Sequence, residues 1–175
     1  MIALIDYRNA LVKFYSYEYE LYVDLLDSVI QKMKGYINDE SNLESGGILT
    51  GYKIKDTSCI VIDDLSVPSH DDLRSRFSFI RKSKIHIRKI LLKKQDQSFC
   101  IGNWHTHPFT TNPIPSQTDI TTWSEELFEC KSSFGYQIFI ICGTKGFRAW
   151  IGKENQNKIY ELAECEKIDE LYVRR

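Results

Sequence analysis

The residues with the clearest chemical potential in this chain are two histidines that stand two positions apart after an apolar run. The run 99–101 predicts a strand that continues to His105 and His107, and Pro108, which lacks a backbone donor, would end it. On a strand, residues two apart point to the same side. Both imidazoles could therefore bind one cation, with nitrogen ligands at about 2.0–2.1 Å if that cation is zinc.

A serine and an aspartate follow at the expected start of a helix. The proline-containing segment 111–115 predicts a tight loop, after which Ser116 would cap the helix and Asp119 would lie in its first turn. This return of the chain could bring Asp119 beside the two histidines as a third ligand. Two histidines and one carboxylate leave a coordination position open, as in a catalytic zinc site, although the same ligand types also suit non-haem iron.

Each of these features also has a simpler explanation. Ser116-x-x-Asp119 matches a helix capping box with Asp in place of Glu. A His-x-His pair is more often exposed or satisfied by hydrogen bonds than bound to a metal. Glu44, just before Gly46 and Gly47, would ordinarily be a solvated loop carboxylate. The metal site is favoured because two histidines and an aspartate fall within fifteen residues and are joined by a turn.

The elements that would position these residues are strands interleaved with a few helices. Leu21, Leu25, Val29 and Met33 recur at helical spacing and predict a helix over 17–34. Apolar runs predict strands at 46–52, 59–65, 74–79, 98–107, 136–142 and 147–151, an opening strand within 2–15, and a last strand or short helix within 159–173. Strands and helices without strict alternation indicate an α+β fold, a central mixed β-sheet flanked by helices.

The segment 80–94 has two interpretations. It combines seven lysines and arginines with Ile87, Ile90 and Leu91, which predicts a basic amphipathic helix. A solvated helix face explains this pattern most simply, and the alternative is a docking surface for an acidic partner. His70, in the loop 67–72, is expected to be exposed, with a position in a cleft as the alternative.

Length and composition narrow the class of protein. With 175 residues, of which 42% are hydrophobic and 27% charged, the sequence fits a single domain over 1–175. A net charge of −1 gives no general attraction to nucleic acid or acidic membranes. The five cysteines are odd in number and form no Cys-x-x-Cys pair, which favours a cytoplasmic protein without a disulfide framework. We expect no secretory leader and no membrane helix, which needs about 20 apolar residues.

Together, these blocks resemble the signature of the JAB/MPN metalloproteases, also called JAMM proteases. The stretch 105–108, a loop, and Ser116-x-x-Asp119 are similar to the metal-binding part of that signature. The segment 44–51 is similar to the glutamate-containing part, and the two parts occur in the family's order. The resemblance covers nearly the whole chain. It implies the cytidine-deaminase-like MPN fold and a Zn2+ ion held by His105, His107 and Asp119.

The resemblance also implies roles for two further residues. In these proteases the residue that matches Glu44 is the general base that acts on the metal-bound water. The serine that matches Ser116 donates to the oxyanion of the tetrahedral intermediate. The product of the reaction is a hydrolysed amide, most often an isopeptide bond after the C-terminal glycine of ubiquitin or a ubiquitin-like protein.

The motif Gly-x-Trp-His-Thr-His-Pro at 102–108 is most similar to that of bacterial members of the family. These are the deconjugating proteases of CBASS anti-phage operons and of ubiquitin-like conjugation operons. The implied partners are a ubiquitin-like protein or another conjugated protein, such as a nucleotidyltransferase, and E1- and E2-like proteins of the same operon. The alternatives are a JAB protease that processes a sulfur-carrier protein, a non-catalytic MPN scaffold, which usually lacks the metal ligands, and a non-haem iron oxygenase, which offers Glu44 no role.

Overall fold

The computed structural model describes residues 10–37, 40–110, 112–129, 132–168 and 171–174. The predicted opening strand is therefore seen only from residue 10, and its residues 2–9 lie outside the described residues, as does Cys130. The described elements are β1 (Ala10–Ser16), β2 (Leu21–Leu26), α1 (Asp27–Ile37), β3 (Gly46–Lys53), β4 (Cys59–Leu65), β5 (Leu73–Arg74), β6 (Phe79–Ile80), α2 (Ile85–Gln95), β7 (Phe99–Thr106), α3 (Gln117–Glu129), β8 (Tyr136–Gly143), β9 (Gly146–Lys153), β10 (Ile159–Glu161), β11 (Ala163–Ile168) and β12 (Leu171–Arg174).

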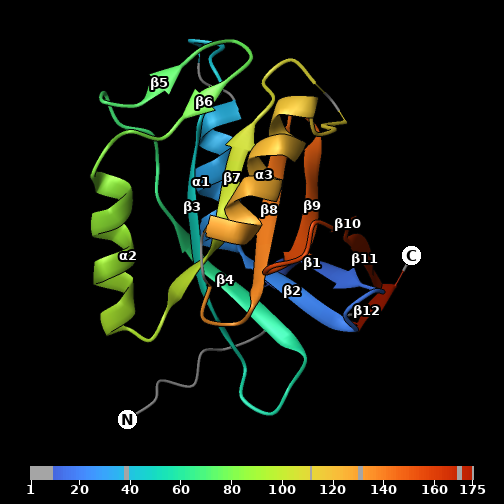
Figure 1. Ribbon diagram of the computed structural model, residues 1–175. Coiled ribbons are helices and arrows are strands. Elements are labelled where there is room, and N and C mark those ends of the chain that lie inside the picture. The colour runs from blue at the N-terminus through green and yellow to red at the C-terminus, as the bar shows by residue number, and fades with distance from the viewer. Residues whose placement is uncertain (1–9, 38–39, 111, 130–131, 169–170, 175) are drawn as a thin grey trace.

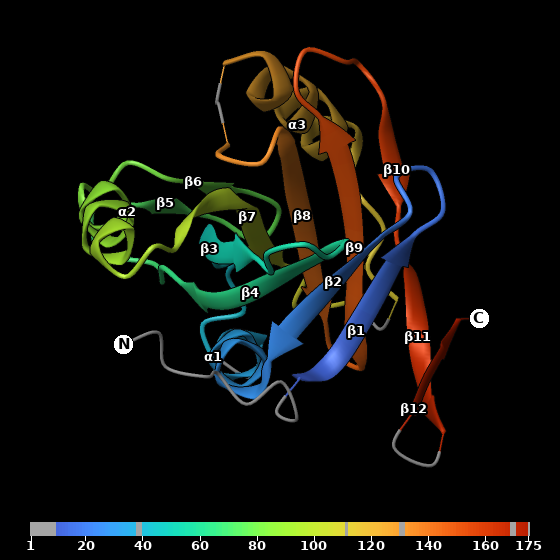
Figure 2. The same cartoon turned by 90° about the horizontal axis from the view of Figure 1, so that it is seen from below.

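Ten of these strands form one mixed sheet, in the order β10-β9-β8-β7-β3-β4-β2-β1-β11-β12. The pairs β7–β8 and β2–β4 are parallel, whereas β3 is antiparallel to both β4 and β7. β1 pairs with β11, so that Phe14 is aligned with Glu164 from the far part of the sequence. Helices α1 and α3 cover opposite faces of the sheet, and α2 lies on the side away from β11 and β12 (Figures 1 and 2). The predicted α+β class with a central mixed sheet is confirmed.

Two apolar clusters hold the helices on the sheet. The larger one buries Val29 and Met33 of α1 against side chains from β2, β4, β7 and β8. In the smaller one, Trp123 of α3 stacks on Phe139 of β8, with ring centroids 4.7 Å apart and planes 11° apart. Burial of an aromatic side chain stabilises a fold by a few kcal/mol, so this stack helps to fix which face of α3 packs on the sheet. No helix in the described residues has the length and apolar character needed to cross a membrane.

The predicted helix over 17–34 is wrong in its first half. Residues 21–26 form strand β2, and the helix begins only at Asp27. Leu21, Val23 and Leu25 are buried on the core side of β2, between the neighbouring strands β1 and β4. A spacing of four residues fits one helix face, but it is also a multiple of the two-residue period of a strand. The apolar pattern alone therefore could not separate the two structures.

Two further elements differ from prediction. The expected strand over 74–79 is a small hairpin, in which β5 and β6 are joined by a turn closed by the N–H of Ser75 donating to the carbonyl of Ser78 at 2.9 Å. The helix expected over 80–94 begins at Ile85 and ends at Gln95. His86 is its buried residue, whereas the side chains of Ile87 and Leu91 are both 61% exposed. The described residues of 159–173 contain strands β10, β11 and β12, which confirms the strand alternative of the two that were predicted there.

A buried polar network fixes the segment that contains this hairpin. The carboxylate of Asp72 accepts the backbone N–H groups of Ser69, Lys82 and Ser83, each at 2.8 Å. It also lies 3.0 Å from Nε2 of His86, whose Nδ1 is 2.5 Å from the hydroxyl of Ser66. Burial alone would raise the pKa of Asp72, but the backbone N–H groups outweigh it and lower that pKa to about 2. The network therefore ties both ends of the hairpin segment to the sheet through one ionised carboxylate.

Replacement of Asp72 by asparagine should lower the free energy of unfolding at pH 7 by about 2–3 kcal/mol, because charge-assisted hydrogen bonds are lost in a buried place. The folded pKa of Asp72 lies below its ordinary value, so its stabilisation is present above about pH 4 and is lost as the pH falls toward 2. The difference between wild type and variant should therefore shrink in urea unfolding series taken from pH 5 downward. Asp71→Asn, at an exposed neighbour, is the matched control, and equal losses in the two variants would contradict the prediction.

Candidate active site

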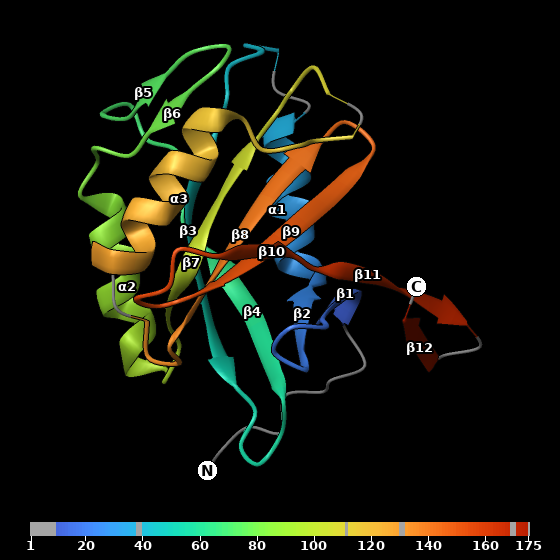
Figure 3. The same ribbon diagram turned by 45° about the vertical axis from the view of Figure 1, so that its right-hand side comes forward.

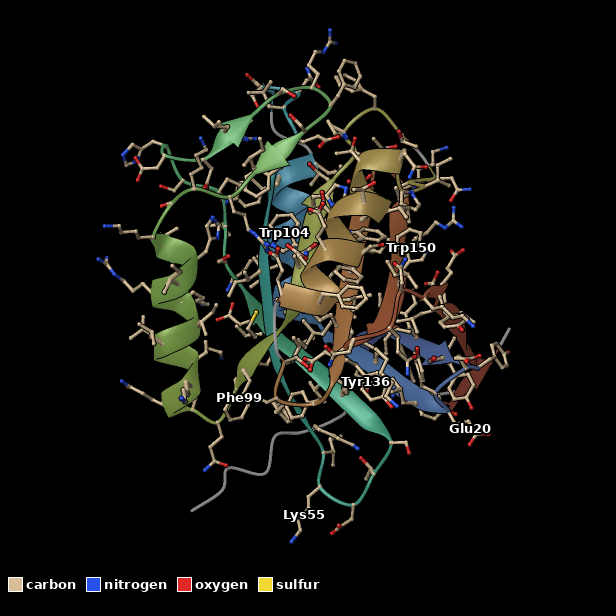
Figure 4. All side chains as sticks on the ribbon, viewed as in Figure 1. Glu20, Lys55, Phe99, Trp104, Tyr136 and Trp150 are labelled. Atoms are coloured by element: carbon tan, nitrogen blue, oxygen red, sulfur yellow. The ribbon has the colours of Figure 1, made fainter. Side chains whose placement is uncertain are left out.

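The two histidines lie at the end of strand β7, in the middle of the sheet. His105 is in the strand and His107 follows directly after it, with ring centroids 4.9 Å apart on the same side. Trp104 points to the other side, where it is 1% exposed and its indole N–H donates to the carbonyl of Ser66 at 3.0 Å (Figure 4). The N–H of His107 donates to the carbonyl of Cys142 in β8 at 2.9 Å. The strand period therefore sets the direction of both imidazoles, as the sequence predicted.

Helix α3 brings Asp119 to the same place. Ser116 caps the helix: its hydroxyl accepts the N–H of Asp119 at 3.2 Å, and Oδ2 of Asp119 accepts the N–H of Ser116 at 2.6 Å. This is the predicted capping box. The hydroxyl of Ser116 also donates to Oδ2 of Asp119 at 2.7 Å. Oδ1 of Asp119 points instead toward Nε2 of His105, 3.2 Å away.

The three side chains have the separations that a single small cation requires. Nε2 of His105 and Nε2 of His107 are 3.1 Å apart, and Nε2 of His107 is 3.6 Å from Oδ2 of Asp119. Ligand atoms arranged tetrahedrally at 2.0–2.1 Å from one zinc ion lie about 3.3 Å from one another. Burial alone would raise the pKa of Asp119, but hydrogen bonds and charge from His105 and His107 hold that pKa below its ordinary range. The donor set therefore fits a divalent cation in both spacing and charge.

Glu44 lies beside this group, just before strand β3. Its Oε1 is 3.8 Å from Nε2 of His107, and the residue is 7% exposed. Burial raises the pKa of Glu44 to about 7, while the neighbouring His107 acts in the opposite direction. Gly46 and Gly47 bring β3 close to its neighbours, since a Cβ atom at Gly47 would lie 2.1 Å from the carbonyl oxygen of Ser66. This is the close backbone approach that glycines within a strand indicate.

Arg74 of the hairpin holds the backbone around Glu44. Its Nε donates to the carbonyl of Glu44 at 3.0 Å, and its Nη2 donates to the hydroxyl of Ser45 at 2.5 Å and to the carbonyl of Leu43 at 3.3 Å. The N–H of Glu44 donates to the carbonyl of Ser75 at 2.8 Å. Glu44 therefore takes its position from the hairpin as well as from β3.

A cleft of about 590 Å³ opens over these groups. Its floor is β7, one wall is α3, and the opposite wall is the segment 76–81 that includes β6. Figure 3 shows the ribbons of β7, α3 and β6. Away from the histidines, the carboxylate of Glu126 in α3 accepts hydrogen bonds from Arg81, at 2.5 Å, and from Asn103. Burial raises the pKa of Glu126, against the opposing charge of Arg81. At the rim, the guanidinium of Arg76 stacks over the ring of Phe109, 4.8 Å from its centroid.

The structure brings together all five residues singled out in the sequence: Glu44, His105, His107, Ser116 and Asp119. His70 is exposed and does not line this cleft, as expected. No pattern in the sequence pointed to Arg74, because an arginine between a leucine and a serine in a short predicted strand has no local signature. Asn103 stands two residues before His105, so the strand period could have placed it on the same side.

Comparisons with known proteins identify the family of the chain. Residues 27–165 match the family described as prokaryotic homologs of the JAB domain. The chain is 32% identical over 149 residues to a protein of Escherichia coli (strain TW11681) named "CD-NTase/cGAS isopeptidase", covering 83% of this chain and 90% of that relative. The solution structure of a protein from Desulfitobacterium hafniense matches with a TM-score of 0.57 and 16% identity, over 78% of this chain and 87% of that one, which shows a shared fold. The chain therefore belongs to the prokaryotic JAB family, within the JAB/MPN group that its histidine and glutamate segments resemble.

Proposed function

We propose that this protein is a zinc-dependent isopeptidase that hydrolyses the amide joining a conjugated protein to its target. The observation that carries the proposal is the convergence of His105, His107 and Asp119, whose ligand atoms all lie within 4.8 Å of one another, with the carboxylate of Glu44 beside them. Membership of the JAB family and similarity to a named isopeptidase add support. A non-catalytic scaffold is disfavoured, since it would not need a buried general base beside the ligands.

His105, His107 and Asp119 would hold the zinc ion. Bound there, it would act as a Lewis acid that polarises the amide carbonyl and lowers the pKa of a water molecule toward neutrality. An iron oxygenase would use the same ligand types, but it has no step that requires Glu44.

Glu44 moves the proton in this proposal. Its carboxylate takes a proton from the attacking water, and the C–N bond then breaks as the same proton is delivered to the leaving amine of a lysine. Burial suits Glu44 to both steps, because a carboxyl with a pKa of about 7 can accept and release a proton near neutrality.

Ser116 would donate to the oxyanion that forms on the carbonyl oxygen. In the structure its hydroxyl donates to Oδ2 of Asp119. A hydroxyl rotates about a single bond, so it can turn its hydrogen from Asp119 toward an anionic oxygen that forms nearby. Its lone pair can still accept the backbone N–H that caps α3. The role therefore requires a change of donor direction but no movement of the helix.

The proposed substrate is a conjugated CD-NTase or a ubiquitin-like protein, joined through its C terminus. The support is the name of the relative from Escherichia coli, "CD-NTase/cGAS isopeptidase", which matches over most of both chains. We propose action in an anti-phage defence setting in the cytoplasm, with E1- and E2-like proteins forming the bond that this enzyme removes. Processing of a sulfur-carrier precursor would use the same residues and the same hydrolysis as the proposed isopeptidase reaction, and would differ only in the bond that is cleaved.

The direct test uses a CD-NTase joined through its C-terminal carboxyl group to a lysine of a reporter protein. Zinc-loaded protein should release the free CD-NTase, with mass spectrometry locating the cut at that amide. A chelator should abolish release, and added zinc should restore it. A linear fusion of the same two proteins is the second substrate, and its cleavage rate shows whether the enzyme prefers an isopeptide or a peptide bond. Failure of the zinc-loaded protein to cut either substrate, or the equivalent ubiquitin-like substrates, would refute the proposal.

Removal of Arg74 should impair catalysis without removing the metal. Arg74→Ala frees the backbone on both sides of Glu44, and a displacement of about 1 Å at a reacting group costs up to ~100-fold in rate. We expect kcat to fall about 10- to 100-fold with KM and zinc content nearly unchanged. Arg74→Lys keeps one donor and should recover part of the rate. A rise in KM with unchanged kcat would indicate that Arg74 binds substrate instead.

A further inference from the structure

The segment 73–95 has an unusual charge composition. It contains nine lysines and arginines and no aspartate or glutamate, although the whole chain carries a net charge of −1. All 24 acidic residues of the chain therefore lie outside it. Lys89 and Lys93 on the inner side of α2 are paired with Asp64 and Asp63 of β4. Lys84, Arg88 and Lys94 are exposed.

The same segment also exposes apolar side chains. Of the eleven large hydrophobic residues that are exposed in the described part of the chain, seven belong to it. They are Leu73, Phe77, Ile80, Ile85, Ile87, Leu91 and Leu92. A merely solvated helix face would turn its aliphatic residues inward, but here the inward position is taken by His86, and Ile87 and Leu91 face solvent. An exposed apolar patch with a charged surround marks an interaction site.

This surface continues into the cleft. The β5–β6 hairpin leads directly into α2, and both lie on the same side of the molecule in all three ribbon views (Figures 1–3). Of these elements, only the hairpin segment lines the cleft. Phe77 and Ile80, which belong to the exposed apolar set, also line the cleft beside Arg81. A protein whose end lies in the cleft would therefore meet this side of the enzyme with its folded part.

We propose that Phe77, Ile80, Lys84, Ile87, Arg88 and Leu91 form a docking surface for the folded part of the substrate protein, which offers an apolar patch bordered by aspartate and glutamate. The inference rests on the proposed function, since it names the chemistry of the substrate. The apolar side chains supply contact area, and the basic ones steer an acidic partner and fix its orientation. A protein partner is favoured over a lipid surface because two residues of the docking surface, Phe77 and Ile80, also line the cleft, and because α2 has only 11 residues.

The test compares two substrates that share one scissile bond: the CD-NTase conjugate described above, and a short peptide carrying only the residues around that bond. Ile87→Ser/Leu91→Ser and Lys84→Glu/Arg88→Glu should each lower kcat/KM for the conjugate about tenfold or more, mainly through KM, as loss of central contact residues does. Cleavage of the peptide should stay within about twofold of wild type. Raising the salt concentration should lower kcat/KM for the conjugate more in the wild type than in Lys84→Glu/Arg88→Glu.

The matched controls are Lys55→Glu and Phe128→Ser, which make the same kinds of change at exposed sites elsewhere. Lys55 lies in the β3–β4 turn, at the opposite end of the molecule from the hairpin (Figure 4). Both controls should behave as wild type on both substrates. Equal losses on conjugate and peptide, or none on either, would overturn the docking surface. So would variants that lose binding to phosphatidylserine vesicles while cleaving the conjugate normally.

Failure of the proposed function is a separate outcome, in which wild-type protein cuts neither substrate. The docking surface is then tested by equilibrium binding of the unconjugated CD-NTase, measured by fluorescence anisotropy. Weaker binding by Lys84→Glu/Arg88→Glu than by Lys55→Glu would support it. Equal binding by these two variants would overturn it.

Discussion

Glu44→Gln should lower kcat by about 10²- to 10⁴-fold while the protein still binds one zinc ion per chain. Glutamine has nearly the same shape as glutamate but cannot take a proton, and general acid–base groups contribute rate factors of this size. Glu44 is not among the three residues whose atoms converge, so its loss should leave the ligand set intact. Single-turnover cleavage of the conjugate and metal analysis of the same sample measure both effects.

Glu125→Gln is the control for this experiment, because Glu125 is an exposed glutamate on α3 outside the cleft. It should cleave at the wild-type rate. If Glu44→Gln turned over at the wild-type rate, Glu44 would not be the general base, and another residue would have to take that role. Loss of zinc in that variant would instead assign the carboxylate to the ligand set.

His107→Ala should lose both zinc and turnover. Only two of the three ligands would remain, and removal of even an outer partner of a metal ligand costs about 10- to 100-fold in affinity, so loss of a ligand should cost more. The carboxylates of Asp119 and Glu44 would also lose a cationic or donor neighbour. Competition with a zinc-binding dye measures the affinity, and the conjugate assay measures the rate.

His70→Ala is the matched control, since His70 is exposed in a loop outside the cleft. It should keep both the zinc affinity and the rate of the wild type. A His107→Ala variant that binds zinc as tightly as wild type would show that the cation is held elsewhere, and the proposed arrangement of ligands would be wrong.

Local periodicity explains why most of this cleft could be anticipated from the sequence. The two histidines depend only on the period of a strand, and Asp119 depends only on a capped helix start close by in the chain. Glu44 is different, because it lies far from the histidines in sequence, and only the resemblance to the JAB/MPN proteases connected it with them. Its position depends on the pairing of β3 with β7, which no local pattern specifies.

The errors arose where local patterns were ambiguous or where distant residues decide the structure. The apolar residues of 21–26 fit a helix face as well as a strand, and pairing with β4 decided in favour of a strand. On α2, the aliphatic residues of an amphipathic helix would ordinarily turn inward, but Ile87 and Leu91 are exposed. Asp63 and Asp64 bind the lysines of the opposite face, and the contact of His86 with Asp72 fixes the helix rotation. Such polar contacts between distant elements leave no mark in a local pattern.

The pairing of β1 with β11 has a consequence for how the chain folds during synthesis. The hairpin of β1 and β2 emerges from the ribosome early, but the partner of its outer edge, at Ala163 and Glu164, emerges much later. Until then β1 is an unprotected edge strand, which can pair with other nascent chains and aggregate. Truncation before Ala163 should therefore lower the yield of soluble protein, because β1 would never gain this partner.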